Sequence, residues 1–207
     1  MRGVLFPRFY PIVDIGVCRT RGVDPLSLAS SLFVAGARFL QLRAKAEHDA
    51  TLDLADAVIA MRPADAIVII NDRADLALMC RASGVHVGQD DLPVEEVRRI
   101  GPGLLVGLST HTPDQVDAGL ETSADYIAVG PVFGTATKDT GYDAVGLDLV
   151  TYAARAGGGR PIVAIGGITI ENAPQVIAAG AAAVAVITDL FVEPVEMRVA
   201  RYLRALE

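Results

Sequence analysis

Short apolar runs rich in β-branched residues alternate along the chain with longer, amphipathic and Ala-rich segments. Each apolar run has the length of a strand that is buried on both faces, which is the strand type of parallel sheets. The pattern therefore predicts eight strands: Phe9 to Asp14, Arg38 to Leu42, Ala66 to Ile70, Val85 to Val87, Leu104 to Leu108, Tyr126 to Val129, Pro161 to Ile165 and Ala183 to Val186.

The segments between these runs have the apolar spacing of helices, and several carry residues typical of helix ends. Asp24 before Pro25 and Thr112 before Pro113 are predicted N-caps, while Gly36 and Gly180 suit the position after a helix. Helices are predicted over Pro25 to Gly36, Glu47 to Met61, Pro93 to Ile100, Pro113 to Gly119, Gly146 to Ala156, Asn172 to Ala179 and Pro194 to Leu206.

Eight β/α units in this chain leave about 26 residues for each unit, which is enough for a closed barrel with short loops. We expect an α/β fold, a (β/α)8 TIM barrel, with residues 1–207 as a single domain because no linker or low-complexity tract interrupts the pattern. A doubly wound open sheet is the alternative. It usually has a GxGxxG turn after its first strand, and here Asp14-Ile15-Gly16 follows instead.

Composition narrows the class of protein without identifying it. Hydrophobic residues make up 52% of the chain, and 18 basic against 25 acidic side chains give a net charge of −7. These values exclude a disordered acidic protein and argue against a nucleic-acid-binding surface. The longest uncharged apolar stretch, Val176 to Ile187, is well short of the ~18 residues of a membrane span.

The N-terminal apolar run is too broken for a signal peptide, so we expect a cytoplasmic protein without a membrane partner. Cys18 and Cys80 form no CxxC motif and are predicted to be unpaired thiols. Aromatic residues are only 5% of the chain and Trp is absent, so no interface anchor is evident and a homo-oligomer stays an open alternative.

Candidate chemistry lies where the strands end, because the active sites of such barrels lie at that rim. Gln41, Arg43 and Lys45 alternate along an extended segment and would therefore point the same way. The two cations could hold an anionic ligand, and the alternative is a solvated strand end.

Carboxylates follow the third and fourth predicted strands. Asp72, together with Asp90 or Asp91, would supply hard oxygen ligands for a Mg²⁺ ion shared with substrate phosphates. The alternative is that Asn71 or Asp72 caps the next helix, which is the better prediction for an isolated Asn-Asp pair. His86 lies within a strand and is predicted to be a hydrogen-bonded core residue.

The later strands end in hydroxyls and glycines. Ser109 is a ligand candidate, and the long polar segment from Gly130 to Tyr142 is predicted to be a lid or ligand loop. Gly166-Gly167 and Thr188 suit a backbone cradle for a phosphate. With Arg43, Lys45 and Lys138 as cations, the rim has charge capacity for a diphosphate and a monophosphate, and no nucleophile for covalent catalysis is evident.

Seven ordered motifs resemble the thiamine phosphate synthase (thiamine-phosphate pyrophosphorylase) family over nearly the whole chain, from Tyr10 to Leu190. They are QLRAK at 41–45, NDRADLA at 71–77, GVHVGQDDLP at 84–93, GLSTHT at 107–112, ADYIAVGPVFGTATK at 124–138, PIVAIGGI at 161–168 and AVAVIT at 183–188.

The resemblance implies a (β/α)8 transferase that joins 4-amino-2-methyl-5-(diphosphooxymethyl)pyrimidine to 4-methyl-5-(2-phosphoethyl)thiazole, with Mg²⁺ as cofactor and diphosphate as leaving group. It implies that the pyrimidine diphosphate is held by Gln41, Arg43, Lys45, Asn71, Ser109 and Lys138, and the metal by Asp72 and Asp91. The thiazole phosphate would be bound by Thr135, Ala136, Thr137, Gly167, Ile187 and Thr188.

The implied mechanism is dissociative, with Arg43, Lys45 and Lys138 stabilising charge on the departing diphosphate. The chain departs from the family pattern at Asp90, where Glu is usual, at Thr188, where many members have Ser, and over Asp139 to Ala144, which lacks the usual prolines. The alternatives are a related thiazole tautomerase and a non-catalytic barrel that binds a phosphorylated metabolite. A sugar-phosphate epimerase would share the glycine cradle, but it would need opposed acid and base carboxylates or metal-binding histidines at the rim.

Overall fold

The eight apolar runs form the strands of a closed barrel. The computed structural model describes residues 6–45, 51–134 and 143–207. Within them the strands are β1 (Phe9–Asp14), β2 (Phe39–Arg43), β3 (Ile67–Asn71), β4 (Gly84–Val87), β5 (Leu105–Thr110), β6 (Tyr126–Val129), β7 (Ile162–Ile165) and β8 (Ala183–Val186). Each strand pairs in parallel with the next, and β8 pairs with β1 to close the barrel. The predicted (β/α)8 fold is confirmed.

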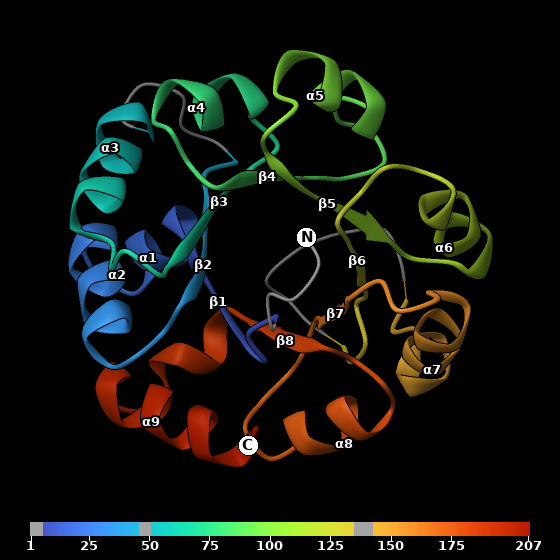
Figure 1. Cartoon of the computed structure of the whole chain (residues 1–207). Helices are drawn as coiled ribbons and strands as arrows, with labels where there is room; N and C mark the ends of the chain where they lie inside the picture. Colours follow the sequence, from blue (N-terminus) through green and yellow to red (C-terminus); the bar gives the residue numbers. More distant parts are fainter. Residues whose placement is uncertain (1–5, 46–50, 135–142) are drawn as a thin grey trace.

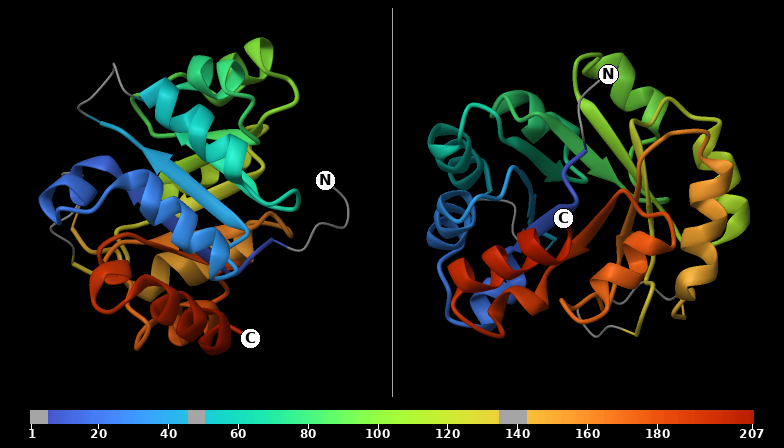
Figure 2. Two further views of the ribbon diagram at one scale, coloured as in Figure 1. Left: turned by 90° about the vertical axis from the view of Figure 1, so that its left-hand side faces the viewer. Right: turned by 60° about the horizontal axis from the view of Figure 1, so that its bottom comes forward.

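Helices form a ring outside the strands (Figure 1). They are α1 (Ile15–Thr20), α2 (Pro25–Val34), α3 (Thr51–Met61), α4 (Ala74–Met79), α5 (Val94–Ile100), α6 (Pro113–Leu120), α7 (Gly146–Ala156), α8 (Ala173–Ala178) and α9 (Val195–Ala205), with the 3-10 helix η1 (Thr188–Phe191). The two views of Figure 2 show the same outer ring from other sides.

Local sequence signals account for several helix ends. The Asp24 carboxylate accepts a hydrogen bond from the Ser27 backbone N–H at 2.8 Å, and the Thr112 hydroxyl accepts one from the Gln115 N–H at 3.2 Å. Gly36 follows α2 and Gly180 follows α8, each with φ of +107°. These predictions are confirmed.

Three short helices were not predicted: α1, α4 and η1. Each has four to six residues, which is too short to show a full amphipathic repeat in the sequence.

The strands are apolar throughout because each contributes to two cores. One core lies between the barrel and the helices and includes Val13, Leu40 and Val68. The other fills the barrel interior and includes Tyr10, Ile12 and Tyr126. Alternate side chains of a strand point to opposite faces, so continuous burial follows from parallel strands covered on the outside by helices.

Both ends of the described chain meet where the barrel closes. The Arg8 guanidinium donates to the Leu206 carbonyl at 2.9 Å, and the rings of Phe9 and Tyr202 stack with centroids 4.8 Å apart. Helix α9 also packs against α2. No helix among the described residues is long and apolar enough to cross a membrane.

Candidate active site

A cavity of about 440 Å³ opens among the residues at the carboxyl ends of the strands. All eight strands contribute to its lining, so residues distant in the sequence converge there. Seven of the predicted ligand residues line it: Gln41, Arg43, Asn71, Ser109, Gly167, Ile187 and Thr188. The prediction that polar residues gather at this rim is confirmed.

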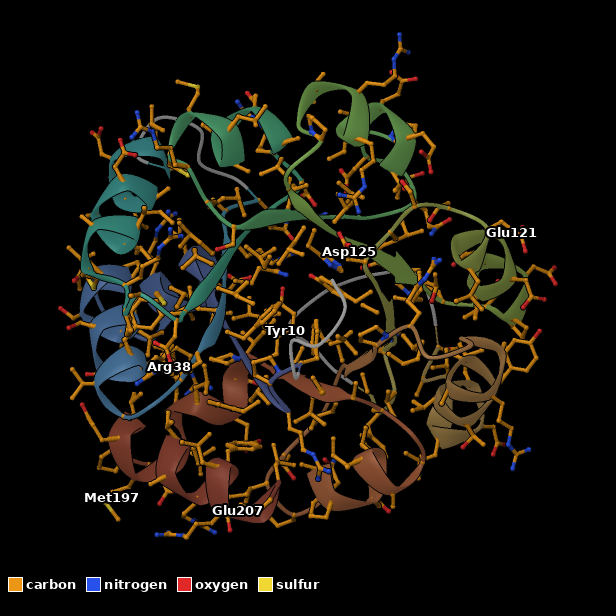
Figure 3. The ribbon with its side chains drawn as sticks, viewed as in Figure 1. Tyr10, Arg38, Glu121, Asp125, Met197 and Glu207 are labelled. Carbon is orange, nitrogen blue, oxygen red and sulfur yellow. The ribbon has the colours of Figure 1, made fainter. Side chains whose placement is uncertain are left out.

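Buried polar side chains form a continuous hydrogen-bonded chain across the barrel interior. The Gln41 amide donates to the Tyr10 hydroxyl at 2.8 Å, and the Tyr10 and Tyr126 hydroxyls lie 3.0 Å apart. Figure 3 shows Tyr10 inside the ring of strands, far from surface residues such as Glu121. Burial raises the pKa of both tyrosines above the usual value, so both hydroxyls keep their protons.

The chain continues from Tyr126 to the opposite wall of the barrel. The His86 Nδ1 atom lies 3.0 Å from the Tyr126 hydroxyl, and His86 Nε2 lies 2.8 Å from Ser109 Oγ. His86 is only 8% exposed. The prediction of a hydrogen-bonded core histidine is confirmed, and its partners show that it also lies at the cavity wall.

Arg43 is held by an acidic partner from the neighbouring strand. Its Nη1 atom pairs with Asp14 Oδ2, and both side chains are largely buried. The other oxygen of Asp14 accepts a hydrogen bond from the Val17 backbone N–H at 2.9 Å and caps α1. Asp14 therefore orients the cation at the end of β2 while it starts the helix after β1.

Asp72 and Asp91 bring two carboxyl groups together beside the cavity, although neither lines it. Burial and the neighbouring Asp91 carboxyl raise the pKa of Asp72 to about 6, against the opposing positive charges of Lys45 and Arg43. Asp91 also accepts a hydrogen bond from the Gly88 N–H at 2.7 Å. Two carboxyl groups crowded in this way fit a divalent cation, because an added positive charge would stabilise both anions.

The structure decides between Asp91 and its neighbour as partner of Asp72. Asp90 is exposed, whereas Asp91 is half-buried against Asp72. The described residues contain no group of three or more His, Cys, Asp or Glu side chains arranged as a complete metal site. Two carboxylates suit a Mg²⁺ ion that takes its remaining oxygens from phosphate and water.

Neither Asn71 nor Asp72 caps the following helix. The N-cap of α4 is Arg73, without a side-chain cap hydrogen bond, so the capping interpretation is wrong. Asn71 lines the cavity, and its Nδ2 atom is buried without a hydrogen-bond partner among the described residues. A buried amide donor without a partner is costly, which indicates that a ligand supplies the acceptor.

Lys45 is exposed and does not line the cavity. Its charge nevertheless lowers the pKa of Asp72, so it lies near enough to act on the acidic pair. For Lys45, the alternative interpretation of a solvated strand end is therefore correct. Gln41 is buried and Arg43 is half-buried, and both line the cavity.

The turn after β7 forms the other side of the cavity. Gly166 and Gly167 have φ of +100° and +62°, and a Cβ on Gly166 would lie 2.5 Å from Pro131 Cα. The Gly166 carbonyl accepts from the Phe133 N–H at 3.0 Å, so this turn packs directly on the segment after β6. Ile187 and Thr188 line the cavity from the end of β8, as a backbone cradle requires.

The cavity also contains residues that the sequence did not single out, namely Tyr10, Arg21, His111 and Asp189. Within the described part of the chain, the Arg21 side chain makes no ion pair. Asp189 is held by a buried ion pair with Arg198, with Nη2 to Oδ2 at 2.6 Å. Contacts between elements distant in the sequence place these residues at the cavity. The only local sequence signal for any of them was the position of Asp189 just after the last predicted strand.

Some predicted ligands lie outside the described residues: Thr135, Ala136, Thr137 and Lys138, with most of the expected lid loop. After this gap, the start of α7 is hydrogen-bonded to the segment that follows β6. The Val145 N–H donates to the Pro131 carbonyl at 2.8 Å, and Gly146 donates to Val132 at 3.0 Å.

A closed (β/α)8 barrel with paired carboxyl groups and a glycine turn at one rim defines a barrel enzyme suited to phosphorylated ligands. The model of the thiamine monophosphate synthase family matches residues 9–190. The chain belongs to this family.

Individual relatives agree with this assignment. A thiamine-phosphate synthase of Koribacter versatilis is 42% identical over 99% of this chain and 98% of its own. That of Acidothermus cellulolyticus is 44% identical over 87% and 85%. The solved thiamine phosphate pyrophosphorylase of Pyrococcus furiosus superposes with a TM-score of 0.85, at 27% identity over 96% of this chain and 95% of that one. The family resemblance read from the sequence is confirmed.

Proposed function

We propose how this chain carries out the activity of its family, the synthesis of thiamine phosphate by group transfer. The substrates are 4-amino-2-methyl-5-(diphosphooxymethyl)pyrimidine and 4-methyl-5-(2-phosphoethyl)thiazole, and the products are thiamine phosphate and diphosphate. One observation carries the proposal. The acidic pair and Arg43 lie on one side of a cavity whose other side is the glycine turn after β7.

The pyrimidine diphosphate is held by Gln41, Arg43, Lys45, Asn71, Ser109 and Lys138. The buried Gln41 and Ser109 suit the polar edge of the pyrimidine, since both line the cavity through fixed side chains. The unpartnered Asn71 amide and the Arg43 guanidinium suit phosphate oxygens, because both present N–H donors.

Asp72 and Asp91 hold Mg²⁺ in this proposal. When bound, the ion neutralises negative charge on the diphosphate. The two residues supply hard oxygen ligands, and the pKa of Asp72, raised to about 6 by burial and by Asp91, reflects the charge that such an ion would relieve.

The thiazole phosphate binds at the opposite side, with Gly167, Ile187 and Thr188 and with the loop residues Thr135, Ala136 and Thr137. Gly167 lines the cavity in a backbone conformation, φ of +62°, that glycine adopts without strain, and the Thr188 hydroxyl adds a donor. Asn172 braces this turn by donating to the Gly167 carbonyl at 3.0 Å.

The reaction is dissociative in this proposal. The diphosphate departs with the C–O bonding electrons, leaving a pyrimidine methylene cation, and the thiazole nitrogen then donates its electron pair to that carbon. Arg43, Lys45 and Lys138 stabilise the charge that grows on the leaving group. No protein nucleophile takes part.

The test is diphosphate release from the complete mixture of pyrimidine diphosphate, thiazole phosphate and Mg²⁺, with each component omitted in turn. Release that needs all three, with thiamine phosphate identified by mass, supports the proposal. Tight binding of the thiazole phosphate without product would favour a tautomerase or a binding protein.

The cytoplasmic location, the single domain over residues 1–207 and the absence of a nucleic-acid partner stay predictions. Whether the chain forms a homo-oligomer is tested by its mass in solution.

A further inference from the structure

The hydrogen-bonded chain through the barrel interior has two ends at the cavity, Gln41 and Ser109. Tyr10 and His86 also line the cavity, whereas Tyr126, at the centre of the chain, does not. Tyr126 is 1% exposed and contacts both neighbours through one hydroxyl group. Its hydroxyl therefore couples the two walls without touching a ligand.

The sequence makes room for this tyrosine at one particular place. Gly107 lies beside Tyr126 in the register of β5 and β6, and a Cβ on Gly107 would lie 2.0 Å from Tyr126 Cζ. The Tyr126 ring also stacks on the His86 ring, with centroids 5.5 Å apart and an angle of 22°. The ring is held on both sides, so the direction of its hydroxyl is restricted.

Each tyrosine hydroxyl has one hydrogen to donate, and this sets the donor-to-acceptor direction of the hydrogen-bonded chain. The Gln41 amide donates to the Tyr10 oxygen, which leaves the Tyr10 hydrogen for the Tyr126 oxygen. The Tyr126 hydrogen is then directed at His86 Nδ1. A histidine that accepts at Nδ1 is neutral and carries its hydrogen on Nε2.

The two ends follow from this direction. His86 Nε2 lies 2.8 Å from Ser109 Oγ, and in this tautomer its N–H donates to that oxygen, so the Ser109 hydroxyl keeps its own hydrogen to donate elsewhere. At the other end one N–H of the Gln41 amide is used by Tyr10, and the Oε1 atom is the acceptor that this side chain offers. The cavity thus meets a donor on one wall and an acceptor on the other.

We propose that Tyr126 is a positioning residue that holds His86 as the neutral Nε2–H tautomer and thereby sets Ser109 as a donor and Gln41 as an acceptor. This pattern matches a heteroaromatic amine, whose ring nitrogen accepts a hydrogen bond and whose amino group donates one. The ligand part of this inference rests on the proposed function, since the pyrimidine substrate is such an amine.

The direct test is the tautomer of His86 in the ligand-free protein, measured by ¹⁵N NMR of the imidazole nitrogens at neutral pH. The chain has three histidines, so the His86 signals are identified by their loss in His86→Gln. We expect a protonated Nε2 and an unprotonated Nδ1. A protonated Nδ1 would mean that the series of hydrogen bonds from Gln41 to Ser109 runs in the opposite direction, and would overturn the inference.

Tyr126→Phe tests the role of the hydroxyl. We expect the His86 signals to change to a mixture of tautomers, and KM for the pyrimidine diphosphate to rise about tenfold while KM for the thiazole phosphate stays the same. Tyr152→Phe is the control, because the Tyr152 hydroxyl bonds to Asp117 on the exposed outer face. Wild-type tautomer signals and kinetics in Tyr126→Phe would also overturn the inference.

These readouts separate this inference from the proposed function. An Nε2–H tautomer in a protein that makes no thiamine phosphate would leave the hydrogen-bond direction standing and remove the reaction. Normal synthesis of thiamine phosphate with an Nδ1–H tautomer would leave the proposed function standing and overturn the hydrogen-bond direction.

Discussion

Arg43 illustrates how single residues in this site depend on neighbours that are distant in the sequence. The pattern QLRAK predicted Arg43 as an anion ligand, but its ion pair with Asp14 comes from the register of β1 and β2, which places the two residues side by side. The same limit applies to Asn71, whose buried unpartnered amide became evident only from its surroundings. Residue type was readable from the sequence, whereas each residue's partner was not.

Asp91→Asn should weaken the apparent affinity for Mg²⁺ by at least about tenfold. Loss of a residue that only hydrogen-bonds to a metal ligand already lowers metal affinity by about 10- to 100-fold, and Asp91 is proposed as a direct ligand. Asp90→Asn is the matched control and should leave the affinity unchanged, since Asp90 is exposed. The measurement is a Mg²⁺ titration of diphosphate release. Equal effects of the two substitutions would show that the metal assignment is wrong.

Lys138→Ala should lower kcat by about 100-fold or more, as the loss of one donor to a developing charge does in other enzymes. The measurement is steady-state diphosphate release at saturating substrates. Arg155→Ala, on the exposed face of α7, removes a cation away from the rim and should leave kcat as it is. An unchanged kcat in Lys138→Ala would remove this residue from the proposed mechanism.

At the scale of elements, the turn after β7 and the segment after β6 form one packed unit. The sequence predicted the Gly166-Gly167 turn as a phosphate cradle, and the structure adds a second reason for both glycines. Their side-chain positions are filled by Pro131 and Phe133 of the neighbouring segment. A pair of glycines is too common to reveal such a contact from the sequence alone.

Gly166→Ala should therefore destabilise the protein by about 1–3 kcal/mol, because alanine is strained at positive φ and would overlap Pro131. We also expect a higher KM for the thiazole phosphate. Gly103→Ala is the control, since nothing lies within 4 Å of its Cβ position. Urea unfolding measures the difference, and equal stability of the two variants would contradict this account of the turn.

At the scale of the whole molecule, closure of the barrel brings the last elements of the chain onto the first. Beside this closure, Arg198 of α9 pairs with Asp189 of η1 and with Glu193, and the Arg198 side chain is only 3% exposed. The Tyr202 hydroxyl donates to the same Asp189 carboxylate. This cluster fixes the cavity residue Asp189 and the path of the chain from β8 into α9.

Arg198→Ala should lower the free energy of unfolding by about 3–5 kcal/mol, because it leaves the Asp189 charge buried without its cation. Arg201→Ala removes a more exposed partner of Glu193 and should cost less than about 1 kcal/mol. Chemical denaturation of both variants gives the comparison. Similar losses in the two would show that the buried pair contributes no more than a surface one.

The sequence by itself determined the alternation of strands and helices, the barrel and its rim, and the residue types that face it. These follow from local periodicity, capping signals and the ordered motifs, all of which lie within short stretches of chain. Only the tertiary structure decided which residues meet. The hydrogen-bonded chain from Gln41 to Ser109 joins five strands, and Asp72 after β3 meets Asp91 after β4. Such contacts depend on strand register and barrel closure, which no local pattern encodes.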